Sequence, residues 1–146
     1  MYGDMAGGLS VLIYFFKSRV YAGSTYINQK EGREIIPNSI ITKEPSAELR
    51  ENQKDSDSLP PYEILDPILE SYVEIDHDRD EIITLGFSPE IVDKIIQMVD
   101  RNEYKRQQSA IGIKITPRAY GPGRRMPITN RWKEKWMNKQ IIKKQY

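Results

Sequence analysis

The segment from Lys43 to Pro61 constrains the fold of this chain most, because it has no apolar face to bury. It reads KEPSAELRENQKDSDSLPP, and its aliphatic side chains are limited to Ala47, Leu49 and Leu59. Connections longer than about 12–15 residues are uncommon in compact domains and are usually functional or disordered. We therefore expect a long loop over 43–61, with regular elements before and after it.

The sequence after this loop predicts three helices with apolar faces. Apolar residues recur at helical spacing over 62–73, and Pro67 either kinks this helix or begins a new one capped by Asp66. Asp78 or Asp80 is expected to begin a short helix that includes Leu85 and ends at Gly86. Ser88 and Pro89 are typical of a helix start, and the apolar stripe that follows predicts a helix to about residue 102.

The remaining segments carry weaker patterns. Residues 9–26 are expected to form a helix, and residues 35–41 an edge strand or extended connection around Pro37. Ile111, Ile113 and Ile115 alternate with small or polar residues, as in a short strand. Loops are expected over 1–8 and 117–127, and a basic helix over 131–142. The chain is thus predicted to be mostly helical, with long loops.

Charge is distributed unevenly along the chain. Residues 43–103 hold 17 acidic and 6 basic residues, whereas residues 105–146 hold 12 basic residues and one acid. A basic tail indicates either an anionic partner or a fold-back onto the acidic middle. The sequence has no cysteine, which excludes disulfides, thiolate metal sites and a cysteine nucleophile in this chain. The single histidine, His77, is interpreted as a surface residue, so no metal site is expected.

Short stretches along most of the chain resemble one family in order and in sequence. They are YGDMAGG (2–8), IITKEPSAEL (40–49), NQKDSDSLPPYEILDPIL (52–69), EIITLGF (81–87), NEYKR (102–106), IKITPRAYG (113–121) and RRMPITNRW (124–132). These stretches resemble the C-terminal part of bacterial glutamine-dependent NAD+ synthetases. Residues 1–132 would then be the C-terminal portion of the synthetase domain, beginning at an internal methionine, and residues 133–146 a basic tail.

The resemblance implies an α/β fold of the adenine nucleotide alpha-hydrolase kind and a ligase; the N-terminal residues lack the basic region of a signal peptide, so a cytoplasmic protein is expected. Such enzymes use ATP and Mg2+ to adenylylate deamido-NAD+, and ammonia from glutamine then displaces AMP to give NAD+. The implied partners are the rest of the synthetase domain, a glutaminase domain or subunit, and further copies in a homo-oligomer. No window is apolar enough for a membrane span. The family's Ser-Gly-Gly-x-Asp-Ser loop for pyrophosphate is absent, so the chain alone is expected to be inactive and to hold no catalytic residue.

The resemblance also implies ligand contacts for particular residues. Lys43 would reach the ATP phosphates, where an ammonium group neutralises developing charge. A mobile loop that closes over the site would carry Asp55, Ser56 and Asp57. The deamido-NAD+ contacts would be Lys105, Tyr104, Glu103 and Asp4.

Three further interpretations depend on residues near the C-terminus and on the two short helices. Arg118, Arg124 and Arg125 are expected to hold the C-terminal segment on the synthetase body or across a subunit interface, because arginine suits carboxylates and phosphates. Residues 80–99 together with the basic tail also allow a small nucleic-acid-binding module, although the second helix is acidic. A non-catalytic remnant that binds another synthetase chain is the third possibility.

Overall fold

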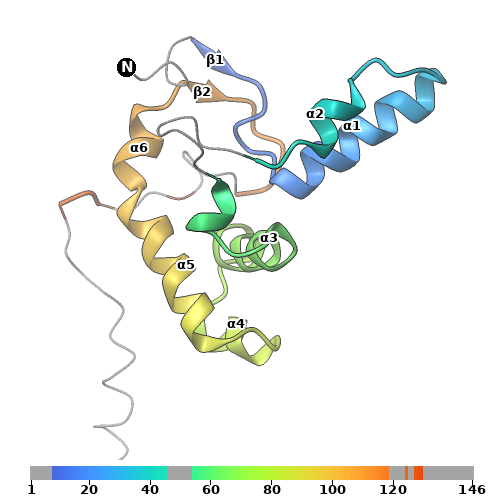
Figure 1. The fold of residues 1–146 in the computed structure, drawn as a ribbon. Helices are drawn as coiled ribbons and strands as arrows, with labels where there is room; N and C mark the ends of the chain where they lie inside the picture. The colour runs from blue at the N-terminus through green and yellow to red at the C-terminus, as the bar shows by residue number, and fades with distance from the viewer. Residues whose placement is uncertain (1–7, 46–53, 119–123, 125–126, 130–146) are drawn as a thin grey trace, which may run out of the picture.

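A computed structural model of the chain describes residues 8–45, 54–118, 124 and 127–129. Four helical elements form a packed unit: α3 (Tyr62–Leu69), the π-helical turn η3 (Glu70–Ile75), α4 (Arg79–Thr84) and α5 (Pro89–Arg101). Figure 1 shows α1 (Lys17–Glu31) and α2 (Asn38–Thr42) extending to one side of this unit. The short strands β1 (Leu9–Ser10) and β2 (Ile111–Gly112) lie at the end opposite α4, next to α6 (Glu103–Gln108).

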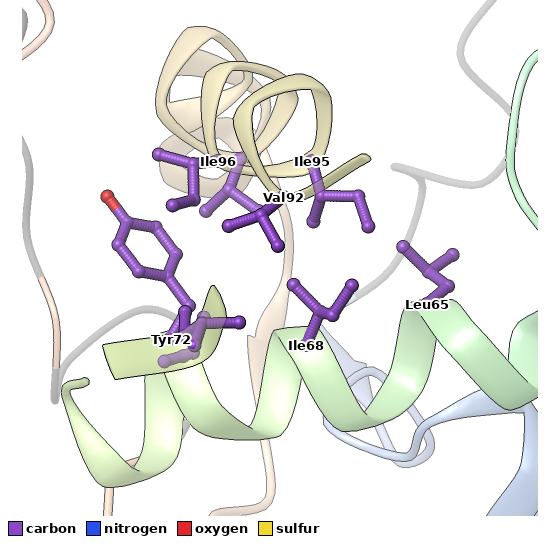
Figure 2. Close-up of a cluster of buried hydrophobic side chains, with 9 residues drawn as sticks. Leu65, Ile68, Tyr72, Val92, Ile95 and Ile96 are labelled. Carbon is purple, nitrogen blue, oxygen red and sulfur yellow. The ribbon is translucent and has the colours of Figure 1, made fainter. Parts of the chain in front are cut away.

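One apolar cluster holds the helical unit together. Figure 2 shows side chains of α3 and η3 facing side chains of α5. The buried members of the cluster are Leu65, Ile68, Tyr72, Val73, Ile82, Val92, Ile95, Ile96 and Val99. All nine come from residues that the sequence pattern placed on apolar helix faces, so this part of the prediction is confirmed.

Pro67 lies inside a continuous helix, which decides between the two sequence-based alternatives for residues 62–73. Asp66 does not cap a new helix: it is buried, and its Oδ2 accepts a hydrogen bond from the Ser18 amide at 2.9 Å. The amide of Glu70 donates to the carbonyls of both Asp66 and Pro67, where α3 passes into η3. A proline removes one helical hydrogen bond, and single π-helical turns are a recurrent local adjustment within helices.

The boundaries of α4 and α5 agree with the prediction. Asp78 and Glu81 form a reciprocal capping box at the start of α4, and Gly86 after it has a φ of 100°. Pro89 is the first residue of α5, and the hydroxyl of Ser88 before it donates to Glu90 Oε2 at 2.7 Å. Leu85 was expected on the apolar face of α4, but it follows the last helical residue and is exposed.

The elements before the long loop differ from the prediction. The helix predicted over 9–26 instead begins at Lys17 and continues to Glu31, and no described residue of α1 is buried. An edge strand or extended connection was predicted over 35–41, but residues 38–42 are helical. The side-chain amide of Asn28 bonds the backbone of residues 35 and 36, which folds the chain back along α1 before α2 begins.

The strands form a small parallel sheet in which Leu9 pairs with Ile111 and Ser10 with Gly112. The strand predicted from alternation over 111–115 is therefore confirmed only in its first two residues. The predicted helix over 131–142 and nearly all of the predicted N-terminal loop lie outside the described residues. No helix in the described ranges is long and apolar enough to cross a membrane.

Candidate functional site

Lys43 lies where α2 ends and the polar segment begins, and it is exposed. The next residue, Glu44, forms an ion pair with Lys54 Nζ at 2.7 Å and accepts a hydrogen bond from Ser56 Oγ at 3.0 Å. The Asp55 amide donates to the Pro45 carbonyl at 3.1 Å. These contacts join residues 44 and 45 to residues 54–56. Hydrogen bonds from the Lys54 ammonium and the Ser56 hydroxyl lower the pKa of the Glu44 carboxyl.

The three residues predicted for a mobile loop form the 3-10 turn η2 (Asp55–Asp57). The Tyr62 hydroxyl donates to Asp55 Oδ2, which links this turn to the first residue of α3. Burial, followed by the Asp55 carboxylate, raises the pKa of the Tyr62 hydroxyl. Of the segment predicted as a long loop over 43–61, residues 46–53 lie outside the described residues, and residues 55–57 form this 3-10 turn. Its predicted mobility stays a prediction.

The second candidate group lies on α6. Tyr104 and Lys105 are exposed, whereas Glu103 is only 3% exposed. Arg106 donates to Glu103 Oε2 through Nε at 2.9 Å and Nη2 at 2.7 Å, and Gln107 donates to Glu103 Oε1 at 3.3 Å. Because Arg106 Nη2 also donates to the Val99 carbonyl at 2.5 Å, the pair fixes α6 to the end of α5.

A cluster of Tyr72, Asp100 and Arg124 lies beside this junction, and sequence reasoning did not find it. The Tyr72 hydroxyl donates to Asp100 Oδ1 at 3.1 Å, and the Arg124 guanidinium lies 3.8 Å from the centre of the Tyr72 ring. Arg124 Nη1 donates to the Tyr72 carbonyl at 3.2 Å. Burial raises the pKa of Tyr72 to about 12 and also raises the pKa of Asp100, despite the neighbouring arginine.

Arg118 and Arg124 join the segment after β2 to residues of this chain on η3, next to it, and on α5. Arg118 Nη1 pairs with Asp76 Oδ2 at 2.5 Å, and the Arg118 amide donates to Glu74 Oε2 at 3.2 Å. Thr116 Oγ1 donates to Glu74 Oε1 at 2.7 Å. The Arg118 guanidinium lowers the pKa of Asp76. Arg125 and Asp4 lie outside the described residues.

The two candidate lysines belong to different elements of the described fold: Lys43 follows α2, and Lys105 is part of α6. Figure 1 shows α2, which Lys43 follows, and α6, which holds Lys105, on either side of the β1–β2 sheet. Among the described residues, no group of three or more His, Asp or Glu side chains could hold a metal ion. The described part of the chain therefore supplies two separate exposed lysines and a polar loop base, and their shared ligand site stays a prediction.

The two short helices give little support to a nucleic-acid interface. Arg79 of α4 contacts Asp93 of α5 through Nε at 2.5 Å and Nη2 at 3.0 Å, so both side chains bridge the two helices. The apolar face of α5 is buried against α3 and η3 (Figure 2). The unburied part of α5 carries Glu90 together with Lys94 and Arg101, so its charge is mixed and it presents no basic stripe for phosphates.

The described residues combine helices with a parallel sheet of two short strands, as in part of an α/β protein. The model of the NAD synthase family matches residues 1–109. The chain belongs to the NAD synthase family.

Several relatives are named glutamine-dependent NAD(+) synthetase. The protein of Acinetobacter baylyi is 50% identical over 133 residues, which are 91% of this chain and 25% of the relative. The protein of Thermotoga maritima is 50% identical over 134 residues, 92% of this chain and 23% of the relative. The chain spans about a quarter of the length of the curated relatives it matches.

A solved structure is also similar to about nine tenths of this chain. It is the glutamine-dependent NAD+ synthetase of Acinetobacter baumannii in complex with adenosine diphosphate, with 43% identity and a TM-score of 0.50. The match covers 90% of this chain and 22% of that one. The fold is therefore of the NAD synthase α/β type, and the chain corresponds to a minor part of it.

Proposed function

We propose that this chain is the C-terminal portion of a glutamine-dependent NAD+ synthetase, with its domain part at residues 1–132 and a basic tail at 133–146. The reaction is the ATP-dependent amidation of deamido-NAD+ to NAD+ through an adenylylated intermediate, with ammonia from glutamine. The observation that carries the proposal is the identity of 50% to a synthetase over nine tenths of the chain. Because the chain matches about a quarter of that relative, we propose that it needs the remaining parts for activity.

In this proposal Lys43 contacts the phosphates of ATP. Its side chain is exposed where α2 ends, directly before the base of the polar loop. An ammonium group on a flexible stem stabilises negative charge that develops on a pyrophosphate leaving group. The ion pair between Glu44 and Lys54 supports this assignment, since it engages the adjacent carboxylate with a different cation.

Deamido-NAD+ contacts Lys105 and Tyr104 on α6, together with Asp4. The exposed ammonium and phenol are available to a dinucleotide phosphate and ring, respectively. We assign Glu103 a supporting part of this site, because its carboxylate is buried and accepts hydrogen bonds from Arg106 and Gln107. Asp55, Ser56 and Asp57 belong to the loop that closes over the reactants.

In this proposal the complete enzyme takes Mg2+ with ATP; among the described residues, no cluster of three or more histidine or carboxylate side chains could hold the metal. In this proposal ammonia comes from a glutaminase domain or subunit; this chain itself contains no cysteine nucleophile. We further propose a homo-oligomeric, cytoplasmic enzyme.

An assay for NAD+ with two preparations tests the proposal. The chain alone, supplied with ATP, Mg2+, ammonia and deamido-NAD+, is expected to make no NAD+. Co-expression with the Acinetobacter baylyi relative, cut to remove the part that this chain matches, is expected to restore NAD+ formation. Lys43→Ala is expected to raise the KM for ATP, and Lys105→Ala the KM for deamido-NAD+.

Lys94→Ala is the matched control, because Lys94 is an exposed lysine of α5 that has no part in the proposed site. Turnover by the chain alone would show that the missing parts are not needed. Equal kinetic constants for all three lysine variants would contradict the site assignment.

A further inference from the structure

Helix α6 carries two exposed residues that we propose to contact deamido-NAD+, Tyr104 and Lys105, yet it adds nothing to the apolar cluster of the helical unit. It is six residues long and has no side-chain hydrogen bond at its N-cap. Short helices are marginal in water without tertiary contacts. Among the described residues, the apolar cluster and the residues packed against it include no side chain of α6. The direction in which α6 points therefore depends on polar contacts.

Arg106 supplies the strongest of these contacts. Its Nε and Nη2 donate to Glu103 Oε2 at 2.9 and 2.7 Å, and Nη2 also donates to the Val99 carbonyl at 2.5 Å. The side chain of Glu103 is 4% exposed and that of Arg106 is 19% exposed, so water screens this ion pair little. Charge-assisted hydrogen bonds of this kind are stronger than neutral ones, and the planar guanidinium group fixes their directions.

The end of α5 provides the other half of the anchor. The last carbonyls of a helix have no partner within that helix. Here the Val99 carbonyl accepts from Arg106, and the Met98 carbonyl accepts from Asn102 Nδ2 at 2.7 Å. At the far end of α6, the Ser109 hydroxyl donates to the Arg106 carbonyl at 2.6 Å. Side-chain hydrogen bonds thus fix the bend at which α6 follows α5 (Figure 1).

The anchored side of α6 is opposite to the side that is available to a ligand. Glu103 and Arg106 are three residues apart, so they share one face of the helix. At 3.6 residues per turn, Lys105 lies about half a turn from Glu103. Exposure agrees with this division, since Glu103 is buried, whereas Tyr104 is 43% exposed and Lys105 is also exposed. The buried face therefore determines where the exposed face presents its phenol and ammonium groups.

We infer that Arg106 is a positioning residue for the binding of deamido-NAD+. It does not touch the dinucleotide; it holds α6 through Glu103 and the Val99 carbonyl, and so fixes the direction in which Lys105 meets the ligand. This inference rests on the proposed function. A lysine side chain is flexible, so a fixed backbone reduces the freedom that is lost when its ammonium group binds a phosphate. Loss of the anchor weakens the binding of deamido-NAD+ and leaves the binding of ATP unchanged.

Kinetics of a complete synthetase test the inference. The enzyme is a chimera in which this chain replaces the part of the Acinetobacter baylyi relative that it matches. Arg106→Ala is expected to raise the KM for deamido-NAD+ at least tenfold and to change the KM for ATP less than twofold. Arg106→Lys keeps the charge but lacks the planar guanidinium group, so its KM for deamido-NAD+ is expected to stay raised at least fivefold.

Two control variants separate positioning from loss of charge and from loss of stability. Arg101→Ala removes an exposed arginine from the last turn of α5, close to the same junction. Asp78→Ala removes the capping box of α4, which precedes the other end of α5, and destabilises the fold there. Both are expected to keep the wild-type KM for deamido-NAD+.

Backbone relaxation of the chain alone, measured by NMR, tests the anchor without any catalysis. Order parameters are about 0.85 for rigid backbone and below about 0.6 for flexible backbone. Residues 103–108 are expected to be as rigid as α5 in the wild-type chain and to become flexible in Arg106→Ala, while α5 stays rigid. The measurement reports on the folded population, so a loss of overall stability does not produce this pattern.

Three results would overturn the inference. The first is a rigid α6 in Arg106→Ala, and the second is a KM for ATP that rises as much as the KM for deamido-NAD+. The third is a wild-type KM in Arg106→Lys, since charge alone would then explain the role of Arg106. A wild-type chimera that makes no NAD+ would instead contradict the proposed function, and the relaxation measurement would still decide whether Arg106 holds α6.

Discussion

The helical unit and the β1–β2 sheet differ in how completely each buries its apolar residues. In the helical unit, α3, η3, α4 and α5 contribute nine buried residues to one cluster. At the sheet, the partnered residues Leu9 and Ile111 remain exposed. The comparison teaches that one region of the chain is packed from its own residues, whereas the other leaves paired apolar residues exposed to solvent.

The largest expected difference between these regions comes from truncating one isoleucine in each. Ile82 is fully buried, so Ile82→Ala is expected to lower the free energy of unfolding by about 2–5 kcal/mol. Ile111→Ala removes an exposed side chain and is expected to change it by less than about 0.5 kcal/mol. Urea unfolding followed by circular dichroism measures both, and equal losses would break the comparison.

The junction of α5 and α6 sharpens the comparison, since it joins the helical unit to the segment before β2. Arg106→Ala leaves the buried Glu103 carboxylate without its main donor and is expected to cost about 1–3 kcal/mol. Glu103→Gln is the milder companion, because it removes the charge and keeps an acceptor for Arg106. If the midpoint of urea unfolding were the same for Arg106→Ala as for the wild type, the Arg106–Glu103 pair would not fix the junction.

The capping box of α4 is a smaller, local test of the helical unit. Asp78→Ala removes the acceptor of the Glu81 amide and is expected to cost about 1 kcal/mol. Asp80→Ala is the control in the first turn of the same helix, since Asp80 is not the N-cap residue. Thermal unfolding of both variants should show the larger decrease in Tm for Asp78→Ala.

The smallest expected effect is a pH dependence at the edge of the core. Burial raises the pKa of Asp100 above its ordinary value, so the folded state binds this proton more tightly than the unfolded state does. Above both pKa values the charged carboxyl disfavours folding, and this cost disappears as pH falls through the raised pKa. Asp100→Asn should therefore be more stable relative to wild type at pH 7 than at pH 4.

Chemical denaturation at both pH values measures that difference. The Tyr72 hydroxyl retains an oxygen acceptor in the asparagine variant. A stability difference that stays constant between pH 7 and pH 4 would contradict the assignment of the raised pKa to Asp100.

The sequence predicted the helical unit well because the unit depends on local signals. Helical spacing identified the buried faces, and Asp78, Gly86 and Pro89 defined the ends of helices. Helix α1 was misplaced because none of its described residues is buried, so no apolar periodicity revealed its limits. Helix α2 was missed because the side chain of Asn28 folds the chain before it, and that contact is not local in sequence.

The candidate site was predicted only in outline. Exposure of Lys43 and Lys105 accords with roles in ligand binding, but the sequence did not indicate that Glu103 is buried against Arg106. The one local indication of this contact was that Glu103 and Arg106 are three residues apart, a spacing at which side chains on a helix can pair. Tyr72, Asp100 and Arg124 meet from distant positions in the sequence, and no pattern in one chain predicts such a meeting.

Hydrogen exchange at the sheet tests the central claim most directly. The chain is measured alone and in the pair with the truncated Acinetobacter baylyi relative. We predict slow exchange for amides of α5 in both samples, and for residues 9–13 and 111–115 fast exchange alone but slow exchange in the pair. Slow exchange of these sheet residues in the chain alone, or no slowing in the pair, would contradict the proposal that this chain is one portion of a synthetase and needs the remaining parts.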